Sequence, residues 1–219
     1  VEDRASRAIK EICRIVKYAL KKKPPAISIH NAHIDALLNF LYWQFKRNPV
    51  LVSEMQKEIE RSLKGIHAPS IKPKQLALEI LDKMGSSGEY DIRSEFQKKN
   101  KVFLCISRPD AHFVTTDKPF VRFNKTTGNG IAMPGTEMYF PITPKILLLM
   151  YGNGNGKMFR LFNNRKHLKA LNTYLARSAS RYVFGPSEAY LQSIVRGINF
   201  SDRPAIPMDD FSAAVSRIL

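Results

Sequence analysis

The chain has 219 residues, of which 44% are hydrophobic and 25% charged, and this composition excludes a disordered polypeptide. No run of eighteen apolar residues exists, and two cysteines, Cys13 and Cys105, are too few for a disulfide framework or a cysteine-rich zinc site. Basic residues outnumber acidic residues by 35 to 19, which gives a formal net charge of +16. Such an excess favours a polyanionic partner, either nucleic acid or an anionic membrane surface, unless it only forms a solvated face.

Apolar residues recur at helical spacing through the first hundred residues, so we expect this part of the chain to be helical. The breaks between helices coincide with prolines and with a Gly/Ser-rich segment at 85–88. The expected helices cover residues 2–22, 29–47, 50–64, about 73–85 and 89–100.

The pattern then changes to short apolar runs separated by turn residues, which is typical of strands. The expected strands cover residues 102–107, 112–116, 120–123, 137–142, 146–151 and 157–162. Helices are expected again at residues 165–182, 187–197 and 209–218.

This order predicts an α+β protein, in which an N-terminal helical layer packs on a mostly antiparallel sheet closed by C-terminal helices. We expect one domain, made of a helical part (1–100), a sheet part (101–162) and C-terminal helices (163–219).

The segment at 152–157, Gly-Asn-Gly-Asn-Gly-Lys, is one residue too short for a phosphate-binding loop, and Met158 replaces the required hydroxyl. Repeated Asn-Gly instead favours a β-hairpin, because both residues tolerate positive φ.

Four segments together resemble a known family. They are FVTTDKP at 113–119, PITPKIL at 141–147, QFKRNP at 44–49, and Asn172 with the following Ala176 and the run 181–183. In this order they are similar to the bacterial "domain of unknown function 4238" family, and they span about residues 1–195.

The resemblance implies an architecture rather than an activity. It marks Gln44, Thr116 and Asn172 as structural or site-adjacent residues. The family usually opens with a His-x-x-Pro and aromatic-rich segment that has no match here, so we expect either the C-terminal part of a longer protein or a shortened member.

Asp117 is the first candidate for a functional carboxylate, because it follows an expected strand and precedes Pro119. It could bind a metal, act as a base, or pair with a buried arginine; alternatively, it caps the turn that follows it through backbone N–H groups. Arg47 ends the second helix beside Gln44, and the two could present donors to a carboxylate or phosphate. The alternative for Arg47 is a structural ion pair with Asp117 or another acid.

His112 is a third candidate, as a general base in phosphodiester chemistry, although a single histidine without an assigned partner is more often an ordinary strand residue. Asp117, Arg47 and His112 in one cleft would suit a phosphodiesterase or nuclease. The sequence predicts no metal site and identifies no cofactor.

The positive charge is concentrated late in the chain, where residues 157–181 hold seven basic residues and no acid. A stripe of this kind suits contact with a phosphate backbone. Its members are Lys157, Arg160, Arg165, Lys166, Lys169, Arg177 and Arg181.

We therefore expect a cytoplasmic protein that associates with DNA, RNA or another phosphate-bearing partner through this basic surface. The alternatives are the phosphodiesterase-type enzyme above and a protein-interaction module whose basic face meets an acidic partner.

Overall fold

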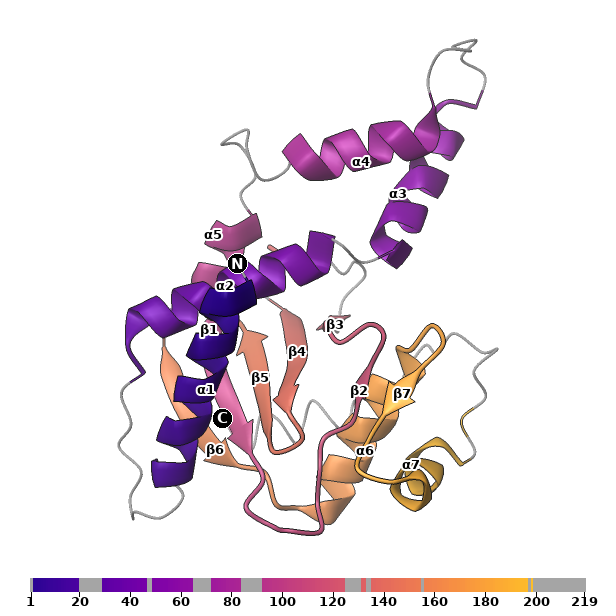
Figure 1. Cartoon of the computed structure of the whole chain (residues 1–219). Coiled ribbons are helices and arrows are strands. Elements are labelled where there is room, and N and C mark those ends of the chain that lie inside the picture. Colours follow the sequence, from indigo (N-terminus) through magenta and orange to yellow (C-terminus); the bar gives the residue numbers. More distant parts are fainter. Residues whose placement is uncertain are drawn as a thin grey trace.

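The computed structural model of the protein describes residues 2–19, 29–46, 49–64, 72–83, 92–124, 131–132, 135–154, 156–196 and 198. Helices come first, strands follow, and two helices close the described chain (Figure 1). The expected α+β class is confirmed. The helix expected at 209–218 lies outside the described residues.

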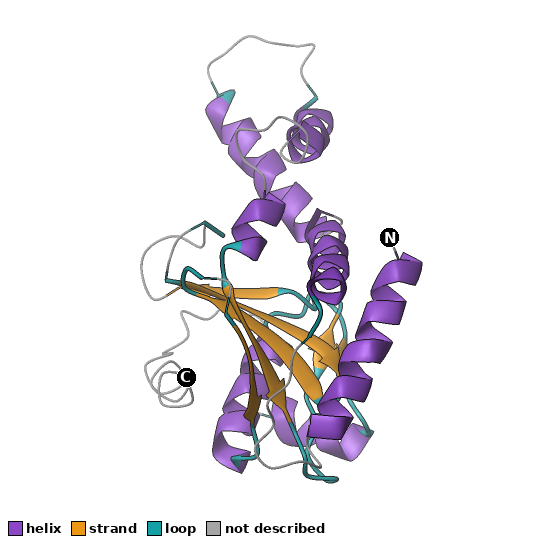
Figure 2. Ribbon diagram, turned by 90° about the vertical axis from the view of Figure 1, so that its left-hand side faces the viewer, coloured by secondary structure: helices purple, strands orange, loops and turns teal. Residues whose placement is uncertain are grey.

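The N-terminal helices begin and end close to where their apolar spacing predicts. They are α1 (Glu2–Ala19), α2 (Asn31–Lys46), α3 (Pro49–Ser62), α4 (Pro73–Lys83) and α5 (Ile92–Gln97). Helices α1 and α2 lie against the sheet, whereas α3 and α4 pack on each other and project beyond it (Figures 1 and 2).

Five strands form the main sheet, in the order β3-β4-β5-β1-β6. They are β1 (Asn100–Cys105), β3 (Val121–Asn124), β4 (Thr136–Thr143), β5 (Ile146–Tyr151) and β6 (Lys157–Leu161). All neighbours are antiparallel except β1 and β6, which run parallel. Two short strands, β2 (Thr115–Thr116) and β7 (Val183–Phe184), pair separately as an antiparallel two-stranded sheet.

Helices cover both faces of the main sheet, as its nearly continuous apolar strands require (Figure 2). On one face, Phe103 and Leu148 pack in a core with α1, α2 and α5. On the other face, Val102 and Leu147 pack against α6 (Arg165–Arg177) and α7 (Glu188–Val195). Successive residues of a strand thus point alternately into two separate hydrophobic cores.

The hairpin predicted at 152–156 is wrong. Strand β1 lies between β5 and β6, so the Gly-Asn loop passes over the end of β1 instead of joining neighbours. The side chain of Asn100 occupies the loop, where its Oδ1 accepts the N–H of Gly156 at 3.1 Å. Gly152 (φ +56°) and Gly154 (φ +152°) adopt the positive φ that the motif favours, but they do so to wrap Asn100.

The closing helix α6 is shorter than the expected 165–182. Asn164 caps its start by accepting the N–H of His167, and the helix ends at Arg177, with Ser178 as its C-cap. Arg181 therefore lies on the segment that leads into β7, beyond the helix that carries Arg165, Lys166, Lys169 and Arg177.

Candidate nucleic-acid interface

The carboxylate of Asp117 binds the backbone of the segment that connects α6 to β7. Its two oxygens accept the backbone N–H groups of Ser180 and Arg181 at 2.9 and 3.0 Å. Its own N–H donates to the carbonyl of Tyr182 at 3.2 Å. Asp117 therefore accepts backbone N–H groups, but those of a segment more than sixty residues away and not those of the turn that follows it. Thr116 supports this turn by accepting the N–H of Lys118 at 3.0 Å.

Asn172 is fully buried on α6, and its side-chain amide connects residues 112–114 with Tyr190 of α7. Its Oδ1 accepts the N–H of Val114 at 3.1 Å, and its Nδ2 donates to the carbonyl of His112 at 2.8 Å. The same Nδ2 lies 3.1 Å from the hydroxyl of Tyr190. An asparagine can satisfy donors and acceptors at once, which explains why this residue type occupies the position.

His112 is half-buried beside Tyr190. The two rings meet edge to face, and their centroids lie 5.8 Å apart. Its Nδ1 is shielded from solvent and has no hydrogen-bond partner among the described residues. Burial, followed by the nearby charge of Lys145, lowers the pKa of His112. Burial also raises the pKa of Tyr190, so both groups are held neutral near pH 7.

A polar turn at residues 108–111 lies next to this histidine. Lys145 donates to the carbonyls of Arg108 (2.6 Å), Pro109 (3.0 Å) and Ala111, which fixes the turn against the β4–β5 connection. Hydrogen bonds from Arg108 hold the pKa of Asp110 at about 2, and Arg165 lies 3.0 Å from the same carboxylate. Asp110 and Arg165 are thus paired to each other on the surface.

The structure distributes the seven late basic residues over both sides of the sheet. Lys157 lies on the α2 side, where its Nζ donates to Asn31. Arg160 is half-buried and donates to the carbonyl of Phe159 at 3.3 Å. Lys166 and Lys169 are exposed on α6, and Arg177 is half-buried near its end.

Lys166, Lys169 and Arg177 fall at intervals of three and eight residues, so they follow one outward face of α6. This face extends about 16 Å at the rise of an α-helix. Within the described part of the chain, no acidic side chain forms an ion pair with the charged group of Lys166, Lys169 or Arg181. We call these four residues, Lys166, Lys169, Arg177 and Arg181, the cationic row.

Two large aromatic side chains continue from the end of this row, and sequence reasoning missed them. Tyr182 is 60% exposed and Phe184 is 52% exposed, on either side of the more buried Val183. Their ring centroids lie 6.2 Å apart, with the planes tilted by 33°. The available signal was alternation: in a strand, residues two apart share a face, and Val183 takes the inner one.

The ring of Phe184 borders a cavity of about 240 Å³. Phe113, Thr115, residues 141–144 and residues 184–186 line it, and the lining is mostly apolar. The structure thus brings together here two of the segments that carry the family resemblance, 113–119 and 141–147.

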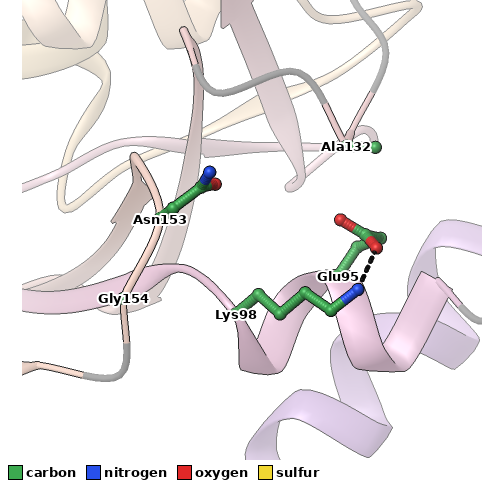
Figure 3. A pocket seen from close by; sticks show the side chains of 5 residues that line it. All are labelled: Glu95, Lys98, Ala132, Asn153 and Gly154. Carbon is green, nitrogen blue, oxygen red and sulfur yellow. Dashed lines mark hydrogen bonds and ion pairs between the residues drawn. The ribbon is translucent and has the colours of Figure 1, made fainter.

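A second, more open hollow of about 540 Å³ lies at the opposite end of β1 (Figure 3). Glu95 and Lys98 form an ion pair along its wall, with Nζ and Oε1 2.8 Å apart, and Asn153 faces them across the hollow. On this wall, Glu95 and Lys98 thus neutralise each other.

The described residues include only some of the other predicted site residues. Gln44 is half-buried on α2, and Arg47 lies outside the described residues, so the pairing of Arg47 with Asp117 stays a prediction. Among the described residues, no group of three histidine, cysteine or acidic side chains could hold a metal ion. No described helix has the length and apolar character needed to cross a bilayer.

These features define an α+β protein with a five-stranded sheet between two helical layers and an aromatic and cationic surface beside the β2–β7 pair. The family model for the protein of unknown function DUF4238 matches residues 1–189, and the chain belongs to that family. No curated protein and no solved structure matches the chain.

Proposed function

We propose that this protein binds single-stranded nucleic acid along the cationic row and the exposed rings of Tyr182 and Phe184. The observation that supports it most strongly is the adjacency of these rings to Arg181. Proteins that bind single strands combine a positively charged track for the backbone with aromatic side chains on which bases stack. Both components occur here on one continuous stretch of chain.

The exposure of the two rings distinguishes a binding surface from a basic face that only contacts solvent, because such a face has no use for exposed aromatic side chains. A tyrosine and a phenylalanine that are each more than half exposed cost free energy in water, and stacking on a base recovers it. Duplex DNA hides the faces of its bases inside the stack, so these rings favour a single strand over a duplex.

The charge distribution supports the same surface. The formal net charge of +16 gives a long-range attraction to any polyanion, and the cationic row lacks acidic partners among the residues that the structure describes. Arg165 contributes less than the sequence suggests, because Asp110 already pairs with it.

Salt dependence of binding to an oligothymidylate and to a duplex of equal length tests the proposal. We expect binding to the single strand at low salt, with affinity that falls steeply as salt rises. Lys166→Gln together with Lys169→Gln should reduce the slope of log affinity against log salt by about 1.4, which corresponds to two lost phosphate contacts on a single strand.

Lys10→Gln with Lys17→Gln provides a matched control, because both lysines are exposed on α1, across the sheet from α6. This control should leave the slope unchanged. Absence of binding to the single strand at low salt, or equal effects of the two double variants, would contradict the proposal.

A further inference from the structure

Within the part of the chain that the structure describes, a defined cavity borders Phe184. Drug-sized ligands occupy pockets of about 300–1,000 Å³, and this cavity, at about 240 Å³, is sized for a single ring system. Its mostly apolar lining suits a flat aromatic group, and the hydroxyl-bearing side chains of Thr115 and Thr143 add polar atoms to the wall.

The sheet topology explains why the cavity exists. Strand β3 pairs with β4 only from Thr136 to Tyr139, whereas β4 continues to Thr143. Past Tyr139, the outer edge of β4 has no strand beside it among the described residues. Pro141 stands in this stretch, and it has no N–H that would need a partner there.

A register shift between Pro141 and Thr143 interrupts the pairing of β4 with β5, and residues 141–144 line the cavity together with Thr115 and Phe184 of the β2–β7 pair. Opposite it, Thr115 and Phe184 are cross-strand partners, so their side chains form one wall together. Asp117 holds the segment from Ser180 to Tyr182, which places β7 against β2. The cavity is therefore built by fixed backbone elements.

We propose that this cavity receives one unstacked base of a bound single strand, next to the bases that stack on Tyr182 and Phe184. This inference rests on the proposed function. The aromatic ring of a base fits an apolar cavity bordered by Phe184, and its exocyclic groups can reach the Thr115 hydroxyl. Its phosphate would then lie outside, on the side of Arg181.

Charge complementarity selects this occupant over an apolar peptide. A peptide side chain could fill the same cavity, but it would leave the neighbouring cationic row without anionic partners. A nucleotide supplies both the ring and the phosphate, so one ligand accounts for the cavity, the rings and the row together.

Filling the cavity while preserving its rim tests the proposal. Thr115→Phe places a ring in the space and suits a strand, whereas Thr115→Val keeps the volume nearly constant and removes only the hydroxyl. Fluorescence anisotropy measures the affinity of each protein for twelve-nucleotide oligothymidylate and for an abasic strand with the same phosphates. Thermal unfolding establishes that the variants are folded; if Thr115→Phe unfolds, the smaller Thr115→Leu replaces it.

We expect Thr115→Phe to weaken oligothymidylate binding by about tenfold and to leave binding of the abasic strand unchanged, since one base contact is lost. Thr115→Val should bind oligothymidylate nearly as tightly as the wild type. If the folded filled variant binds oligothymidylate like the wild type, the cavity takes no base, although the proposed function stands. If the wild type binds neither strand at low salt, the proposed function fails first and the cavity proposal falls with it.

Discussion

The carboxylate of Asp117 accepts the backbone N–H of Arg181 at 3.0 Å, although 64 residues separate them. This contact joins the segment that resembles the family signature to the segment that carries the exposed rings. It makes Asp117 a positioning residue for the proposed interface: the acid fixes the backbone at 180–182, and the side chains of Arg181 and Tyr182 remain exposed.

Replacing Asp117 with alanine should therefore affect both stability and binding. The loss of two charge-assisted hydrogen bonds to partly exposed N–H groups should lower the free energy of unfolding by about 1–2 kcal/mol. Binding to oligothymidylate should weaken as the 180–184 segment loses its fixed position. Asp117→Asn, which keeps one acceptor oxygen, should fall between the wild type and Asp117→Ala in urea unfolding. Wild-type affinity in a folded Asp117→Ala variant would contradict the positioning role.

Asn172→Ala should be among the most destabilising single substitutions on α6. It leaves the buried N–H of Val114 without its acceptor, and it removes one of the two donors to the carbonyl of His112, which keeps the hydroxyl of Tyr190. We expect a loss of about 3 kcal/mol in the free energy of unfolding, measured by urea denaturation. The neighbouring Thr173→Ala, on a partly exposed position, is the control and should cost far less. Equal costs for the two variants would show that the Asn172 network contributes little.

Lys101 should make the free energy of unfolding depend on pH. Burial, with a further contribution from Lys157, lowers the pKa of Lys101 from 10.5 to about 8, although Asp35 opposes the shift. Between these two values the unfolded chain binds more protons than the folded protein, so this residue makes the free energy of unfolding rise with pH.

Lys101→Met should remove that contribution. We expect the unfolding free energy of the wild type, relative to Lys101→Met, to increase by about 1–3 kcal/mol between pH 7.5 and 10. Urea unfolding at the two pH values measures it, and Lys10→Met, on the exposed face of α1, is the control. A constant difference across this range would show that Lys101 ionises normally in the folded protein.

Gly154 should resist substitution for two separable reasons. A Cβ at this residue would lie 2.5 Å from Oδ1 of Asn100, and the backbone has a φ of +152°. We expect Gly154→Ala to cost about 1–3 kcal/mol in urea unfolding. In an Asn100→Ala background the steric part disappears, so the same substitution should cost less. If its cost is the same in both backgrounds, the Asn100 contact does not constrain this loop.

Periodicity predicted most of the helices and strands because it reflects local burial. The apolar spacing of α2 and the continuous apolar run of β5 each describe one element and its nearest core. The placement of β6 beside β1 was not predictable in this way. It depends on a pairing across the loop at 152–156, where the Asn-Gly signal favours a local hairpin.

The candidate interface was only half visible in the sequence. The charge count singled out Lys166, Lys169 and Arg181, since charge needs no knowledge of the fold. Tyr182 and Phe184 were missed because the expected helix extended to residue 182 and no strand was expected at 183–184. Their exposure follows from the pairing of β7 with β2 alone, which leaves the outer face of β7 uncovered.

Photo-crosslinking with an oligonucleotide that carries 5-iodouracil tests the central claim most directly, since it reports which side chains the bases touch. After digestion and mass spectrometry, we predict that the crosslinked peptide contains Tyr182 and Phe184, and that crosslinking disappears when both are replaced by alanine. Crosslinks that map to α1 or to the hollow at Glu95 and Lys98 instead, and that persist in the double alanine variant, would contradict the account.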